Sequence, residues 1–144
     1  MTTESKVRLL LLLTDDNFMA EVLGTYLRRD NIDVERVAST DDVVRAIGGG
    51  ADGVLVDLAK RGLAGDAIMN LTTRAQRWEI PVLILSAQPR RDLAEFAAVV
   101  HATDVVSKSE PMTAIAARVR LCMRTPLRPQ PSAAPVQQVS WALA

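Results

Sequence analysis

The stretch "VRLLLLLTDDN", from Val7 to Asn17, passes directly from a run of leucines into two adjacent aspartates. A nearly continuous apolar run is typical of a strand that is covered on both faces of a parallel sheet. Asp15 and Asp16 follow it, at the point where the strand would leave the core. Two neighbouring carboxylates repel one another and lose hydration there, so the pair requires either open water or a bound cation.

Four further apolar blocks predict strands, at Asp33 to Ala38, Gly53 to Asp57, Pro81 to Ser86 and Thr103 to Lys108. Amphipathic segments between the strands predict helices. These segments are Asn17 to Arg29, where Asn17 can cap the start, Thr40 or Asp41 to the glycines at 48–50, Gly65 to Arg77, Arg90 to His101, and a last helix that begins near Met112. The regular alternation predicts an α/β protein of the doubly wound (βα)5 type, with a parallel sheet.

The 144 residues are enough for one domain with its own core. We expect a short disordered N-terminus over residues 1–5, a domain over residues 6–124, and a proline-rich linker or tail over residues 125–144. The segment Val136 to Ala144 contains several apolar residues, and docking onto a partner or onto the domain itself is an alternative to disorder there.

Composition excludes several classes of function. Lys and Arg together number 17, as do Asp and Glu, so the net charge is zero and direct binding of nucleic acid is not favoured. The single cysteine, Cys122, excludes an internal disulfide. The leucine run is too short for membrane insertion, and the first residues lack the features of a signal peptide, so we expect a cytoplasmic protein.

Polar residues stand at the ends of four predicted strands. Ligands of open parallel sheets bind at the carboxyl ends of the strands. Asp15 and Asp16 follow the first strand, and Asp57, Ser86 and Lys108 end the third, fourth and fifth. Any one of them can simply cap a helix or face solvent, but their coincidence at four strand ends favours a common site.

The chemistry of this set is coherent. Carboxylates without histidine or thiolate nearby favour Mg²⁺ or Mn²⁺. Asp57 can act as a nucleophile toward phosphorus, while Lys108 and Ser86 can bind phosphoryl oxygens.

These motifs resemble the receiver domain of bacterial two-component response regulators, the CheY-like phosphoacceptor family. "LTDDN" looks like its acidic pair, "VLVDLAKRGLAG" like its phosphorylation segment, "LILSA" like its strand-four hydroxyl and "VVSK" like its lysine. The resemblance covers about residues 6–124. It implies a flavodoxin-like fold with strand order 2-1-3-4-5.

The resemblance also implies roles for individual residues. Asp57 would be the phosphoacceptor, with Ser86 and Lys108 as its catalytic partners. Mg²⁺ (or Mn²⁺) would be bound by Asp15, Asp16, Asp57 and the backbone carbonyl of Ala59.

The partners that the resemblance implies are proteins. A sensor histidine kinase or phosphotransfer protein would donate the phosphoryl group, and an output protein would receive the signal. The signal would pass through the surface of the fourth helix, fifth strand and fifth helix, which is also a surface for a homodimer. The domain would not be a turnover enzyme.

Departures from the family pattern leave two alternatives open. Val105 stands where the family commonly has an aromatic switch residue, and Ser109 stands where proline is common after the lysine. Both favour a pseudo-receiver, a non-phosphorylated scaffold for protein interactions. The second alternative, a small phosphohydrolase with an aspartate nucleophile, is disfavoured because Ala59 occupies the position where such enzymes typically carry an acid.

Overall fold

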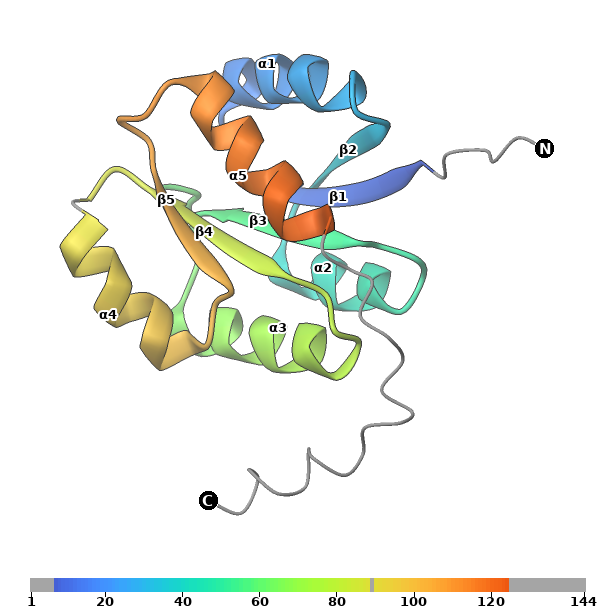
Figure 1. The fold of residues 1–144 in the computed structure, drawn as a ribbon. Coiled ribbons are helices and arrows are strands. Elements are labelled where there is room, and N and C mark those ends of the chain that lie inside the picture. Colours follow the sequence, from blue (N-terminus) through green and yellow to red (C-terminus); the bar gives the residue numbers. More distant parts are fainter. Residues whose placement is uncertain (1–6, 89, 125–144) are drawn as a thin grey trace.

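The structure is a computed structural model that describes residues 7–88 and 90–124. The expectations for residues 1–5 and 125–144 lie outside the described residues. Five strands alternate with five helices in the described part (Figure 1). The strands are β1 (Arg8–Leu13), β2 (Ile32–Val37), β3 (Gly53–Asp57), β4 (Val82–Ser86) and β5 (Asp104–Ser107). The helices are α1 (Asn17–Arg28), α2 (Thr40–Ile47), α3 (Gly65–Arg77), α4 (Arg90–Val100) and α5 (Met112–Arg124).

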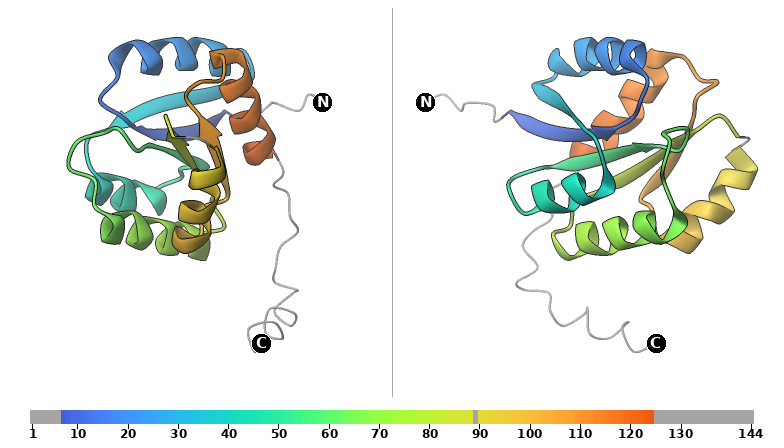
Figure 2. Two further views of the ribbon diagram at one scale, coloured as in Figure 1. Left: turned by 90° about the vertical axis from the view of Figure 1, so that its left-hand side faces the viewer. Right: turned by 180° about the vertical axis from the view of Figure 1, so that it is seen from behind.

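The strands form one parallel sheet in the order β2-β1-β3-β4-β5. Helices α1 and α5 cover one face, and α2, α3 and α4 cover the other (Figures 1 and 2). The predicted (βα)5 fold class and its strand order are therefore confirmed. In this arrangement β1 lies on one side of β3, whereas β4 and β5 lie on the other.

The leucines of β1 serve both faces of the sheet. Leu10 and Leu12 pack into the core beneath α1 and α5, and Leu11 and Leu13 pack into the core on the opposite face. All four have no exposed surface. Because side chains alternate between faces along a strand, a central strand needs apolar residues throughout. Each buried leucine stabilises the fold by about 2 kcal/mol.

The boundaries of several strands differ slightly from those predicted. β2 begins at Ile32 rather than Asp33, because Ile32 pairs with Arg8 and is buried in the core. β4 begins after Pro81, which has no backbone N–H to donate to a sheet. β5 is an edge strand of only four residues, shorter than the predicted Thr103 to Lys108.

The start of α1 also differs from the prediction. Asp16 caps the helix instead of Asn17, and its Oδ1 accepts a hydrogen bond of 2.9 Å from the N–H of Met19. Phe18, although apolar and within the helix, is 73% exposed. The buried face of α1 is formed by Met19, Leu23, Gly24 and Leu27. No helix within the described ranges is long and apolar enough to cross a membrane.

Candidate functional site

Asp57 is the centre of a bonded cluster at the carboxyl end of β3. The residue is only 1% exposed, so its carboxylate needs polar partners. Lys108 Nζ lies 2.9 Å from Oδ1, and the N–H of Ala59 donates to the same oxygen at 3.0 Å. Oδ2 accepts a hydrogen bond from Thr14 Oγ1 at 2.6 Å. Each oxygen of the buried carboxylate therefore has at least one hydrogen-bond donor or cation as its partner.

Lys108 reaches Asp57 across the intervening strand β4. The backbone N–H of Lys108 donates to the carbonyl oxygen of Ser86 at 2.8 Å, which continues the pairing of β4 with β5 by one residue. The long side chain of lysine then spans the distance back to β3. Its side chain is 26% exposed, so the ammonium has contact with solvent as well as with Asp57.

Ser86 ends β4 at the same edge of the sheet. The residue is buried, and its Oγ accepts a hydrogen bond from the N–H of Gln88 at 3.0 Å. That bond uses a lone pair and leaves the hydroxyl proton available as a donor. The structure thus brings Asp57, Lys108 and Ser86 to one edge, with Asp57 and Lys108 in direct contact.

Asp15 contacts the loop after β3 rather than Asp57. Its Oδ1 lies 3.2 Å from Lys60 Nζ, and its Oδ2 accepts from the N–H of Arg61 at 3.0 Å. The Arg61 hydrogen bond, together with Lys60, lowers the pKa of Asp15 below its ordinary value of 3.8. Asp15 is therefore ionised and paired at neutral pH.

Asp16 has two separate local contacts. Its carboxylate caps α1, as described above, and its backbone N–H donates to Thr14 Oγ1 at 3.0 Å. The expected cluster of three carboxylates is not formed in this conformation. Within residues 7–88 and 90–124, no three Asp, Glu, His or Cys side chains are grouped to hold a metal ion.

The chemical type of the side chains, carboxylates, is nevertheless the one that Mg²⁺ prefers. Asp15 and Asp16 lie between β1 and α1, and Asp57 ends the neighbouring strand β3, so all three carboxylates belong to the same edge of the sheet. Hard oxygen donors are what Mg²⁺ prefers. Binding through Asp15 requires that Lys60 give up its ion pair with that half-exposed carboxylate.

Sequence reasoning missed three residues of this edge: Thr14, Lys60 and Arg36. Arg36, on β2, donates from its guanidinium to the carbonyl oxygen of Thr14 at 2.9 Å and to Asn17 Oδ1 at 2.5 Å. Thr14 carries a sequence signal, since it is the first polar residue after the leucine run and immediately precedes the acidic pair. Lys60 and Arg36 have none, because each acts across a large separation in the chain.

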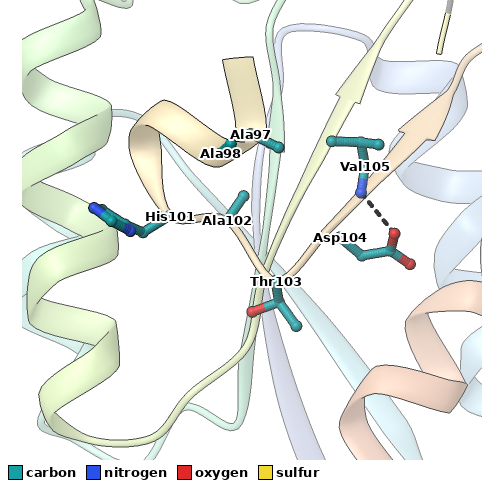
Figure 3. Close-up of a pocket in the computed structure, with 7 residues that line it drawn as sticks. All are labelled: Ala97, Ala98, His101, Ala102, Thr103, Asp104 and Val105. Atoms are coloured by element: carbon teal, nitrogen blue, oxygen red, sulfur yellow. Dashed lines mark hydrogen bonds between the residues drawn. The ribbon is translucent and has the colours of Figure 1, made fainter. Parts of the chain in front are cut away.

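A shallow pocket lies elsewhere on the molecule. It is lined by the end of α4, the connecting loop and the start of β5: Ala97, Ala98, His101, Ala102, Thr103, Asp104 and Val105 (Figure 3). Asp104 begins β5, so the pocket lies toward the amino ends of the strands, whereas Asp57 ends β3. The pocket contains no residue of the Asp57 cluster.

The comparisons with known proteins agree with this fold. The sequence model of the response regulator receiver domain matches residues 10–120. The chain therefore belongs to the response regulator receiver domain family, a family of signalling domains. The comparison with curated proteins gives no match.

Solved structures of response regulators share the fold. A response regulator from Chloroflexus aurantiacus J-10-fl is 23% identical, with a TM-score of 0.70 over 82% of this chain and 98% of that one. The chemotaxis protein CheY4 of Vibrio cholerae is 14% identical, with a TM-score of 0.69 over 81% of this chain and 99% of that one. The BeF3-activated receiver domain of Klebsiella pneumoniae RstA is 22% identical, with a TM-score of 0.66 over 82% of this chain and all of that one, 100%.

Proposed function

We propose that this chain is a phosphoacceptor domain that is phosphorylated on Asp57 and passes the modification on as a change in its protein contacts. One observation carries the proposal: a carboxylate buried at the end of β3 is paired with Lys108 at 2.9 Å, in a member of the receiver family. A buried ion pair is costly to retain for stability alone. A carboxylate nucleophile beside a cation at a strand end is, by contrast, suited to phosphoryl transfer.

In the proposed reaction, a carboxylate oxygen of Asp57 attacks the phosphorus of a phosphohistidine. The new O–P bond forms as the P–N bond breaks, and the imidazole leaves with the electron pair and takes up a proton. The Lys108 ammonium stabilises negative charge on the phosphoryl oxygens, and the Ser86 hydroxyl donates to another of them. The product is an acyl phosphate on Asp57, and the domain completes no catalytic cycle on its own.

A divalent cation, Mg²⁺ or Mn²⁺, would be held by Asp15, Asp16, Asp57 and the Ala59 carbonyl, where it would neutralise charge on the phosphoryl oxygens. The phosphoryl donor would be a sensor histidine kinase or a phosphotransfer protein. The output would pass through the α4, β5 and α5 surface to a partner protein or a second copy of the domain.

Mass spectrometry after treatment with acetyl phosphate and Mg²⁺ tests the proposal. The expected result is one phosphoryl group on the wild-type protein and none on Asp57→Asn, with loss of the modification when the metal is chelated beforehand. Uptake that is equal in the Asp57→Asn variant would contradict the assignment of the acceptor.

A pseudo-receiver is the second candidate, and one contact favours it. Lys60 already neutralises Asp15, one of the acids expected to hold the cation. A chain that supplies its own cation can keep this edge of the sheet folded without metal or phosphate. If the wild-type protein takes up no phosphoryl group from acetyl phosphate, a scaffold role is supported instead.

A further inference from the structure

We propose that Thr14 is a positioning residue of the phosphoacceptor site, whose hydroxyl holds Oδ2 of Asp57 and so presents Oδ1, beside Lys108, to the phosphoryl donor. This inference rests on the proposed function and adds a residue to it. Thr14 stands between β1 and the acidic pair and is 2% exposed.

The hydrogen bonds of Thr14 have a defined direction. The N–H of Asp16 donates to Thr14 Oγ1 at 3.0 Å, which occupies a lone pair of the hydroxyl. Asp57, as a carboxylate, can only accept, so the hydroxyl proton points to Oδ2 over 2.6 Å. A short bond between a neutral donor and an ionised acceptor is among the stronger hydrogen bonds in proteins.

The two oxygens of Asp57 face different strands. Oδ1 is bound by Lys108 and Ala59, whereas Oδ2 is bound by Thr14. In the sheet, β1 lies on one side of β3, and β4 and β5, which supply Ser86 and Lys108, lie on the other. The groups that can receive phosphoryl oxygens are therefore on the Oδ1 side. Thr14 restrains the carboxylate from rotating and exchanging the two oxygens.

Thr14 is itself held firmly. Arg36 donates to its carbonyl oxygen at 2.9 Å and to the side chain of Asn17, which ties the turn after β1 to β2. Restraint of this kind places a reacting group near its attack geometry before the substrate arrives, and even small misplacements are costly in rate.

A purely structural role would use only half of these contacts. The bond from the Asp16 N–H closes a local turn and needs Oγ1 only as an acceptor. The donated bond to Asp57 joins residues 43 positions apart in the chain and satisfies an oxygen of the proposed nucleophile. Substitution by valine or serine distinguishes the two roles, because valine keeps the shape of threonine without its hydroxyl and serine keeps the hydroxyl.

The test compares Thr14→Val, which keeps the shape, with Thr14→Ser, which keeps the hydroxyl. The rate of phosphorylation by acetyl phosphate is measured at saturating Mg²⁺. We expect Thr14→Val to react at least about tenfold more slowly than wild type, because the carboxylate is then free to rotate away from its attack geometry, and Thr14→Ser to stay within about threefold. The Ala59 amide resonance should shift in Thr14→Val, because its acceptor Oδ1 moves, and should be restored in Thr14→Ser.

Other outcomes separate the inference from the proposed function. Normal phosphorylation of Thr14→Val, or equal slowing in Thr14→Ser, would overturn the role of Thr14 and leave Asp57 as the acceptor. A wild-type protein that takes up no phosphoryl group would overturn both. Thermal unfolding checks that each variant is folded. If Thr14→Val is not, Thr14→Ala, which also lacks the hydroxyl and adds no bulk, takes its place with the same expected slowing.

Discussion

Lys60 Nζ lies 3.2 Å from Oδ1 of Asp15, so a cation of the chain itself sits beside an acid expected to bind metal. The two residues belong to the loops that follow β3 and β1. The Lys60 side chain is 14% exposed and that of Asp15 is 50% exposed. Because the Asp15 carboxylate is half exposed to water, the pair contributes about 0–1 kcal/mol, and a divalent cation can displace Lys60 from it. Lys60 and Mg²⁺ therefore compete for Asp15 in the proposed function.

Replacement of Lys60 tests this competition. We expect Lys60→Gln to bind Mg²⁺ about two- to fivefold more tightly than wild type, the range that an exposed ion pair allows, in a calorimetric or NMR titration. Arg61→Gln is the matched control. It removes the same charge from the neighbouring position, but it keeps the backbone N–H that Arg61 donates to Asp15. Equal tightening in the two variants would mean that Lys60 acts only through net charge.

Lys60 also affects the acid titration of Asp15, after the larger effect of the Arg61 N–H. The Arg61 N–H and Lys60 lower the pKa of Asp15 below 3.8, and we expect carbonyl-detected NMR to find it there. A lowered pKa in the folded state means that ionised Asp15 stabilises the fold above the unfolded value, and that this contribution is lost as pH falls through the folded value. Lys60→Gln should raise the pKa of Asp15 partway toward 3.8, since the Arg61 bond persists. A wild-type pKa at or above 3.8 would contradict both contacts.

The fold could be predicted because it depends on local patterns. The leucines of β1 and the "GVLV" part of β3 are apolar on both faces, which only a central strand of a covered sheet requires. The strands whose boundaries differ from the prediction at both ends are the edge strands β2 and β5. At β2 and β5 few residues are buried or the strand is short, so the sequence pattern is weak there.

The candidate site could be predicted only at the strand ends. Asp57 and Lys108 stand there in the sequence, and their contact follows from the strand order. The contacts of Thr14 and Lys60 join residues 43 and 45 positions apart, and nothing in the local sequence selects those partners. Asp16 and Asn17 can both cap a helix, so the choice between them depends on the turn that Thr14 makes.

The capping role of Asp16 changes how its metal role should be tested. Asp16→Ala removes the acceptor for the Met19 N–H and should lower the free energy of unfolding by about 1 kcal/mol in urea denaturation. Asp16→Asn keeps a cap of similar strength and should unfold within about 0.5 kcal/mol of wild type. Both variants should lose Mg²⁺ affinity. Full affinity in Asp16→Asn would remove Asp16 from the proposed ligands.

Arg118 connects β5 and α5, two elements of the proposed output surface. Its Nε and a terminal nitrogen lie 3.0 and 3.1 Å from the two carboxylate oxygens of Asp104. Lysine cannot form this paired geometry, so we expect Arg118→Lys to lower the free energy of unfolding by about 1 kcal/mol. Arg120→Lys is the control, since Arg120 makes a single, more exposed contact of 3.4 Å with Asp30 and should unfold like wild type. Equal losses in the two variants would mean that the paired geometry contributes nothing.

The ion pair of Lys108 and Asp57 predicts that substitutions of the two residues lower the free energy of unfolding by different amounts in metal-free buffer, and that their effects are not additive. Lys108→Met leaves a buried carboxylate without its cation and should cost about 1–3 kcal/mol, less than for a fully buried pair because Lys108 is 26% exposed. Asp57→Asn should cost less, since the freed ammonium can turn to water. In the double variant the buried charge is absent, so Lys108→Met should cost little more there. Urea denaturation measures all four proteins, and additive costs would mean that the 2.9 Å contact carries no coupling.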